Sequence, residues 1–440
     1  MKTALVAVPR GWDVRSLLRT GVLDVLKSSG VRPVLLTPKA SDPDFRAEFG
    51  RFDLEPYRPH QPGRLEGTFR RALNVSYSVR FPDHTLDIMA RRLASHENRE
   101  SLLKRSFWAV VRGASRASPA LHDALRTLEF MMPDDRDLKG VFEKWKPDAV
   151  ISTPLFDWTD VPLLKWCRRL KVPSLSIVAS WDNVSSKGTI QIRPDALIVW
   201  NEDMADEACR THGYERDRVA VTGVPHFDHW AEPERSREAF LRKYGLDPAL
   251  PVIGYFGAGA RVHPNEYECF AHLVEANEKG AFGDRLPIFV RLHPREYRTQ
   301  WDTWRNRPGV IIDTPEHAQG RDWDANRADL DHLADTVRAC AVSMNVCSTI
   351  TIESCIADRP VFNIGYDGDQ VKPEMDSAAR YYRYSHYKRI PDCGIPVAWS
   401  REEMIDLTRR YLRDPALDRE ARARVATALC GPVGGAAERM

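Results

Sequence analysis

The stretch AVSMNVCSTITIESCIADRPVFNIG, residues 341–365, contains two apolar runs separated by a polar turn and a helical pattern. AVSMNV (341–346) and PVFNIG (360–365) are short and continuously apolar, which is typical of strands buried on both faces. Between them, TIESCIA (351–357) places Ile352, Cys355 and Ile356 on one face of a helix. A strand, a helix and a second strand in this order predict a parallel pair with a right-handed crossover. The stretch therefore indicates an α/β fold.

The same alternation runs through most of the chain. It opens with a strand at 2–9, a helix at 14–30 and a strand at 31–38. Further strands are predicted in two series, at 147–153, 172–180, 194–200 and 218–224, and then at 251–259, 286–294, 309–315, 341–346 and 360–365. The polar, proline-punctuated stretch 225–238 separates the two series. We therefore expect two Rossmann-like domains, 1–230 and 231–410, whose parallel sheets face a central cleft, followed by a helix and tail at 411–440.

Residues 64–145 interrupt this pattern. They contain no convincing strand and show several amphipathic helical patterns, of which 93–113 is the clearest. We expect a helical insertion in the first domain.

The bulk composition excludes several classes of protein. The chain has 440 residues, of which 43% are hydrophobic and 29% are charged, as in a soluble globular protein. Its 64 basic residues balance 62 acidic residues, so net charge does not favour nucleic acid. The eight cysteines form no C-x-x-C pair, and no apolar run reaches the ~18 residues of a spanning helix. We expect a cytoplasmic protein with reduced thiols, no metal site and no cofactor.

Three residues in the opening stretch have two possible roles. Ser348 and Thr349 follow a strand and precede a helix, where hydroxyl groups commonly cap free backbone N–H groups. Capping does not explain Glu353, which is one position too far from Thr349 for a capping box. Alternatively, the hydroxyls and the helix N-terminus bind a phosphate while Glu353 binds the paired hydroxyls of a ribose.

Two other strand ends in the second half are suited to the same ligand. FVRLHPREY (289–297) brings Arg291, His293 and Arg295 together where a diphosphate could bind, although a lone histidine there is often only structural. GYFGAGARVHPNE (254–266) contains Gly257 and Gly259, which allow close approach of a ligand or form a tight turn. Neither stretch is a GxGxxG fingerprint or a Walker motif.

In the first half, three polar loops follow strands. RGWDVRS (10–16) contains Gly11, which permits the turn and is expected to contact the acceptor, and Asp13, which either caps the next helix or acts as a base. STPLFDWTD (152–160) contains Asp157. ASWDNVSSKG (179–188) is dense in polar and aromatic groups, and we expect it to contact the acceptor substrate. Its candidate residues are Trp181, Asp182, Asn183, Ser185 and Lys187.

The His293–Pro294 element and the STITIE element (348–353) resemble those of GT-B glycosyltransferases. The resemblance is to the branch with bacterial Kdo- and sialyltransferases, CDP-glycerol glycerophosphotransferases and UDP-GlcNAc 2-epimerases. It implies that His293, Ser348 and Thr349 contact the donor phosphate and that Glu353 contacts the ribose. The epimerases have an SDSGG-type turn and an HRREN-type loop where this chain has CSTIT and HPREY, which disfavours an epimerase.

The resemblance implies a metal-independent glycosyltransferase that transfers a sugar from a nucleotide-sugar to a surface glycan or lipid-linked acceptor. Asp182, Asp157 and Asp13, in that order, are the candidate bases that would deprotonate the acceptor hydroxyl. The first alternative is a glycerophosphotransferase that uses CDP-glycerol. The second is a non-catalytic protein that binds a nucleotide-sugar.

The helical insertion has a local surplus of positive charge. From Arg64 to Arg126 there are twelve basic residues and six acidic residues. Basic and apolar residues on these helices suit peripheral contact with an anionic membrane at the inner face, whereas the alternative is a scaffold packed on the first domain. The residues concerned are Arg70, Arg71, Arg91, Arg92, Arg99, Lys104 and Arg105, with Phe69, Leu93, Leu102, Leu103, Phe107 and Trp108.

Overall fold

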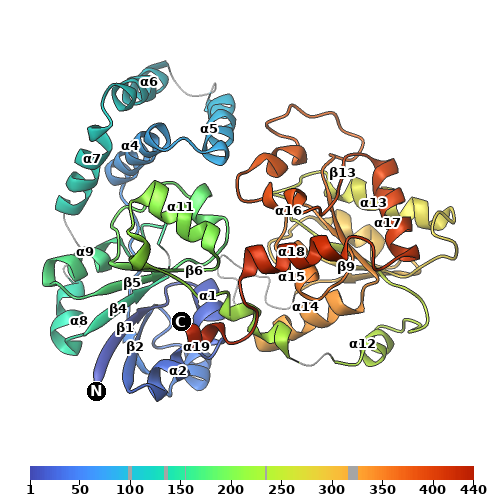
Figure 1. The fold of residues 1–440 in the computed structure, drawn as a ribbon, viewed down its shortest axis with the longest axis horizontal. Coiled ribbons are helices and arrows are strands. Elements are labelled where there is room, and N and C mark those ends of the chain that lie inside the picture. The colour runs from blue at the N-terminus through green and yellow to red at the C-terminus, as the bar shows by residue number, and fades with distance from the viewer. Residues whose placement is uncertain (98–101, 133–136, 154, 233–234, 316–325) are drawn as a thin grey trace. The chain divides into compact units, whose positions relative to one another are not determined.

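The computed structural model is an α/β protein built of two compact units (Figure 1). It describes residues 1–97, 102–132, 137–153, 155–232, 235–315 and 326–440. The first unit comprises Met1–His226 together with Gly435–Met440, and the second comprises Phe227–Gly434. A 3₁₀ helix, η3 (Pro225–Ala231), contains the point at which the chain passes from the first to the second.

The first unit contains a seven-stranded sheet in the order β3-β2-β1-β4-β5-β6-β7, in which all neighbouring strands are parallel. The chain builds outward from β1 to β3 and then returns to the other side of β1, so the strand order reverses between β1 and β4. The strands are β1 (Lys2–Ala7), β2 (Val31–Thr37), β3 (Asp53–Pro56), β4 (Ala149–Ser152), β5 (Ser174–Ile177), β6 (Ala196–Val199) and β7 (Val219–Val221).

Apolar side chains cover both faces of this sheet. On β1, Leu5 packs with Phe142 and Leu163, whereas its neighbour Val6 packs with Leu17 and Phe45 on the opposite face. The helical elements that cover the two faces or extend from them are α1 (Gly11–Asp13), η1 (Val14–Leu18), α2 (Val22–Ser28), α3 (Pro43–Phe49), α4 (Arg64–Arg80), α5 (His84–Glu97), α6 (Leu102–Ala117), α7 (Ala120–Met131), α8 (Asp137–Trp145), α9 (Val161–Leu170), α10 (Asn183–Ser186), α11 (Glu202–His212), η2 (Arg216–Arg218) and α19 (Ala436–Arg439).

The single helix predicted over 14–30 is wrong. The segment forms the π-helical turn η1 and the separate helix α2, because Gly21 adopts a left-handed backbone (φ 80°) between them. The strand-free segment predicted at 64–145 forms α4 to α8 in its described parts (Figure 1). The helix predicted over 93–113 includes 98–101, which lie outside the described residues.

The second unit contains a six-stranded parallel sheet in the order β10-β9-β8-β11-β12-β13. Its strand order reverses between β8 and β11, as the first sheet's does between β1 and β4. The strands are β8 (Ile253–Phe256), β9 (Ile288–Arg291), β10 (Val310–Asp313), β11 (Val342–Asn345), β12 (Val361–Ile364) and β13 (Val397–Ala398). The two parallel sheets confirm the predicted α/β class with two Rossmann-like halves.

Helices of the second unit pack on this sheet around a core that includes Tyr255, Phe270, Trp301 and Met344, and α18 packs on α15. Their bounds are α12 (Arg237–Lys243), α13 (Glu266–Glu278), η4 (Thr299–Trp304), α14 (Arg327–Ala339), α15 (Ile350–Ile356), η5 (Ala378–Arg383), α16 (Arg389–Asp392), α17 (Arg401–Arg413) and α18 (Arg419–Cys430).

The tyrosine-rich segment after β12 is part of this core. The Tyr382 hydroxyl donates to the Ile364 carbonyl (2.6 Å), and the Tyr387 hydroxyl donates to Asn363 Oδ1 (2.7 Å). Both rings are buried. The segment is therefore anchored at the carboxyl end of β12.

All eight cysteines are free thiols. Among the described residues, the structure has no helix that is both long enough and apolar enough to cross a membrane.

Candidate functional site

In the first unit, charged side chains gather where β1 and β4 end. Arg10 follows β1 and Asp157 follows β4, and Arg10 Nη1 lies 2.7 Å from Asp157 Oδ2. Asp13 Oδ2, in the turn that begins at Gly11, accepts a hydrogen bond from the backbone N–H of Arg10 (3.1 Å). Ligands of open α/β sheets bind beyond the carboxyl ends of the strands, where the strand order reverses. These residues occupy that position.

Two buried carboxyl groups lie next to this ion pair. Burial raises the pKa of Asp13 to about 6, although the nearby Arg10 guanidinium opposes the shift. Burial also raises the pKa of Asp160 to about 7, although Ser152 Oγ and the Tyr57 hydroxyl each donate a hydrogen bond to it at 2.9 Å. Such groups can exchange a proton near neutral pH. The sequence did not single out Asp160, because burial is not visible in STPLFDWTD.

Asp13 has no exposed surface, whereas side chains of Arg10 and Asp157 are 38% and 32% exposed. A ligand can therefore reach Arg10 and Asp157 directly. Asp13 is suited to hold Arg10 in place.

The predicted acceptor loop follows β5 and uses much of its hydrogen-bonding capacity internally. Asp182 Oδ2 accepts a hydrogen bond from Ser186 Oγ (2.8 Å) and lies 3.2 Å from Lys187 Nζ. Trp181 is buried, so its ring packs against protein, whereas Lys187 is half exposed. The other predicted acceptor residues lie in α10, namely Asn183 and Ser185.

In the second unit, the predicted glycines lie against His293. The backbone N–H of Gly257 donates to the Arg291 carbonyl (2.9 Å). A Cβ on Gly259, whose φ is 81°, would lie 3.3 Å from the His293 ring. The loops after β8 and β9 therefore pack closely, with little room for a side chain at Gly257, and the left-handed backbone of Gly259 favours glycine there.

The His293 ring is neutral near pH 7. Burial, and then the charge of Arg295, lower its pKa to about 4. Its Nδ1 accepts a hydrogen bond from the backbone N–H of Arg295 (2.9 Å), so the proton is on Nε2. Nε2–H is thus a donor of the kind that a phosphate oxygen accepts. Arg291, in contrast, is buried in an ion pair with Asp313, which neutralises its charge.

Two asparagines accept hydrogen bonds from the polar turn after β11 and from the start of α15. Asn345 Oδ1 accepts a hydrogen bond from the backbone N–H of Ser348 (3.1 Å), and Thr351 Oγ1 donates to Asn363 Oδ1 (2.9 Å). Cys347 has a left-handed backbone (φ 40°), which turns the chain into α15. Ser348 and Thr349 are half-buried at this turn.

Glu353 is buried one turn along α15. The Thr349 hydroxyl lies 3.4 Å from Glu353 Oε1. The predicted Thr349–Glu353 pair is therefore in contact, and its carboxylate has little exposed surface.

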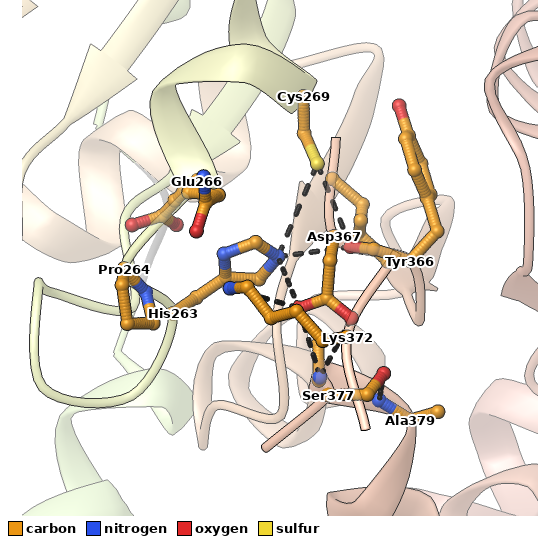
Figure 2. Close-up of polar contacts among 12 residues, drawn as sticks. His263, Pro264, Glu266, Cys269, Tyr366, Asp367, Lys372, Ser377 and Ala379 are labelled. Atoms are coloured by element: carbon orange, nitrogen blue, oxygen red, sulfur yellow. Dashed lines mark hydrogen bonds and ion pairs between the residues drawn. The ribbon is translucent and has the colours of Figure 1, made fainter. Parts of the chain in front are cut away.

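A polar cluster around His263 links the loops after β8 and β12 (Figure 2). His263 is fully buried, and its Nε2 lies 2.9 Å from the Tyr366 carbonyl and 3.9 Å from Asp367 Oδ1. Burial lowers the pKa of His263, so the neutral ring donates to the carbonyl. Asp367 Oδ1 also accepts from the backbone N–H of Ala378 (3.1 Å) and lies 3.4 Å from Lys372 Nζ.

Glu266 connects this cluster to the glycine loop. Its Oε1 accepts a hydrogen bond from the backbone N–H of Ala258 (2.7 Å), between the two glycines. Burial raises the pKa of Glu266 to about 7. A sequence signal could have revealed His263 and Glu266, because HPNEY at 263–267 repeats the pattern of HPREY at 293–297.

Within the ranges that the structure describes, no group of three or more His, Cys, Asp or Glu side chains is placed to hold a metal ion.

No model of a protein family and no curated protein matches the sequence. Solved structures do match the fold. The S. aureus MnaA–UDP structure is 10% identical with a TM-score of 0.57, and the match covers 100% of this chain and 94% of that one. UDP-GlcNAc 2-epimerase from Neisseria meningitidis bound to UDP-GlcNAc is 12% identical with a TM-score of 0.54, over 100% and 98% of the two chains.

UDP-GlcNAc 2-epimerase from Methanocaldococcus jannaschii is 14% identical with a TM-score of 0.52, over 97% of this chain and 98% of that chain. At these identities the matches define the fold alone. The chain has the GT-B fold of two Rossmann-like halves, as predicted.

Proposed function

We propose that this protein is an enzyme that uses a nucleotide-sugar, and that it transfers the sugar to a hydroxyl of a glycan or lipid-linked acceptor. One observation carries the proposal. In each of the two sheets, polar side chains or glycine loops gather where the strand order reverses, which is where open α/β sheets bind ligands. The first sheet supplies Arg10 and Asp157, and the second supplies Gly259, His293 and Ser348.

The second unit is proposed to hold the donor. The Nε2–H of His293 and the hydroxyls of Ser348 and Thr349 are donors for a diphosphate, and Glu353 is proposed to accept from the ribose. Two of the similar structures hold UDP or UDP-GlcNAc, which supports a uridine nucleotide as the first ligand to test.

The first unit is proposed to activate the acceptor. In the transfer, a carboxylate takes the proton of the acceptor hydroxyl, the acceptor oxygen bonds to the anomeric carbon, and the bond from that carbon to the phosphate oxygen breaks. The nucleoside diphosphate leaves with its charge stabilised by the phosphate-binding donors. Asp157 is the first candidate base because it is partly exposed at the switch point, and Asp182 is the second. Asp13 comes last because it has no exposed surface.

A thermal-shift panel of nucleoside diphosphates tests the donor site. A ligand at about 100 times its Kd should stabilise the protein by roughly 2.7 kcal/mol. A panel in which no nucleotide raises the midpoint would contradict the proposal.

Turnover of the Asp157→Asn, Asp182→Asn and Asp13→Asn variants then tests the chemistry. We expect Asp157→Asn to lose turnover while it binds the donor like the parent, since a base acts in the chemical step. Mass spectrometry of the acceptor distinguishes an added sugar from an added glycerol phosphate. Full turnover in all three variants would show that none of the three aspartates is the base.

A 2-epimerase is the second candidate, because the similar structures described above include two enzymes with that name. An epimerase would convert UDP-GlcNAc without any acceptor, and NMR of the sugar would show inversion at C2. Release of nucleotide that depends on an acceptor would favour the transferase.

A further inference from the structure

The helices α4 to α7 expose an unusual number of large apolar side chains. Among the described residues, twelve large hydrophobic side chains are exposed, and six of them lie on these four helices. They are Leu65, Met89, Phe107, Val110, Leu128 and Met131. Such side chains mark an interaction site where they lie together, as Phe107 and Val110 do three residues apart on α6.

Helix α6 combines this apolar surface with positive charge. It spans 16 residues and contains four basic residues and no acidic residue. Lys104 and Arg105 are exposed next to Phe107 (48% exposed) and Val110 (68% exposed). The helix packs on α4 through Trp108, which is buried with the Arg71 guanidinium 4.2 Å above its ring.

A hollow of about 600 Å³ lies between α4 and α6. Its lining includes Arg64, Thr68, Arg71, Lys104, Phe107 and Trp108. Three cations and a hydroxyl beside two aromatic rings suit a phosphate group that is attached to an apolar chain.

We propose that the outer face of α6, with the adjacent hollow, docks on an anionic lipid bilayer. A basic, amphipathic helix with exposed aromatic and aliphatic side chains binds such a surface by burying its apolar face among the head groups. The inference rests on this face alone and does not depend on the proposed function.

The structure corrects which predicted residues can belong to this face. Arg70 is buried in ion pairs with Glu66 and Glu129, so it cannot contact a bilayer. Trp108 is buried against α4 and contributes only to the wall of the hollow. Arg91 is exposed and paired with Asp87. The structure does not describe the side chains of the other predicted residues Leu93, Arg99, Leu102 and Leu103.

The docking helices also hold the predicted acceptor loop. Asn74 Oδ1 on α4 accepts a hydrogen bond from the backbone N–H of Thr189 (3.0 Å). Tyr77 on α4 stacks on His212, whose Nε2 lies 3.0 Å from the Val184 carbonyl. A bilayer bound at α6 would therefore lie on the helical layer that supports residues 184–189.

Co-sedimentation with vesicles tests the proposal on the full chain. We expect the protein to sediment at low salt with equimolar phosphatidylcholine and phosphatidylglycerol, and to stay in the supernatant with phosphatidylcholine alone. High salt should release it, since such attraction is screened over a Debye length of about 10 Å at 0.1 M. Lys104→Glu with Arg105→Glu should weaken binding by at least about fivefold for each cation removed.

Two further variants make the result specific. Val110→Glu changes an exposed side chain and should weaken binding without loss of fold, as checked by circular dichroism. Arg410→Glu with Arg413→Glu, on the mixed-charge helix α17, makes the same charge change elsewhere and should leave binding unchanged. Equal recovery in the supernatant with both vesicle types would overturn the proposal. So would binding of a DNA duplex by the parent in place of vesicles.

Discussion

The chemistry of His293 depends on its neighbours. Burial and Arg295 lower its pKa to about 4, and the backbone N–H of Arg295 occupies Nδ1. The ring therefore presents one N–H donor throughout the neutral range. A phosphate contact made by this donor is a neutral hydrogen bond to an anion, not an ion pair.

We expect His293→Ala and Glu353→Ala each to weaken nucleotide binding by about 1.5–3 kcal/mol, as for loss of a hydrogen bond to a charged group. The contribution of His293 should not change between about pH 6 and pH 8, because its pKa lies below that range. Calorimetric titration of both variants measures this. Binding equal to the parent in both would mean that the donor site has been placed wrongly.

Gly259 and Gly30 form a matched pair for the glycine loop. Both have φ of 81°, but a Cβ on Gly259 would lie 3.3 Å from His293, whereas a Cβ on Gly30 would meet nothing within 4 Å. Each change to alanine should cost about 1–2 kcal/mol of stability through backbone strain. We expect only Gly259→Ala to weaken nucleotide binding as well, because it displaces the His293 ring. Equal nucleotide binding by the two variants would show that Gly259 is not part of the nucleotide site.

Asp160 should make the protein less stable as pH rises. Its pKa is about 7 in the folded state and near 3.8 when unfolded, so the folded state holds the proton longer and loses stability between about pH 4 and pH 7. The parent protein should therefore have an unfolding free energy about 2–3 kcal/mol lower at about pH 8 than at about pH 5 because of Asp160. Asp160→Asn cannot ionise, so this variant should lack that pH-dependent difference. Urea unfolding at the two pH values measures it, with the exposed Asp157→Asn as the control.

Among the elements, the strands show how far pattern and period can predict a fold. The central strands were predicted because they are buried on both faces and therefore continuously apolar. The edge strands β3 and β13 were missed, since DLEP is polar and β13 has only two residues. The break at Gly21 was missed because the apolar spacing continues across it.

For the site, the sequence indicated the loops but not the contacts within them. His293 and Gly259 lie in separate loops that meet only because β8 and β9 are adjacent. The pairing of Arg291 with Asp313 and the burial of Asp160 depend on side chains from other strands and helices. No local pattern encodes such contacts.

The tyrosine-rich segment offers a test at the scale of elements. Tyr387 is buried, and its hydroxyl donates to Asn363 Oδ1 at the end of β12. Tyr387→Phe removes one of the two hydrogen bonds that Asn363 Oδ1 accepts, since Thr351 Oγ1 still donates to it, and should cost about 0.5–1.5 kcal/mol. Tyr297→Phe, on a side chain that is 78% exposed, should cost little. Denaturant unfolding of both variants gives the comparison.

At the scale of the whole molecule, the last six residues belong to the first unit. Ala437 and Met440 pack in the core that contains Leu23 and Phe45, and Arg439 Nε donates to the Thr222 carbonyl (2.9 Å). Removal of residues 436–440 should expose this core.

We expect that truncation to destabilise the first unit selectively. Hydrogen exchange should show faster exchange in α2, which α19 contacts, while the strands β8 to β13 of the second unit keep their protection. Uniform loss of protection over both units would show that they unfold as one.

The return of residues 435–440 has a consequence for biosynthesis. A ribosome synthesises the second unit before it synthesises residues 435–440, which pack against α2. Until then, part of the apolar core of the first unit stays exposed to solvent. At roughly 5–20 residues per second, the 208 residues of Phe227–Gly434 take about 10–40 seconds to add. During that interval the growing chain has an exposed apolar surface to which a chaperone can bind.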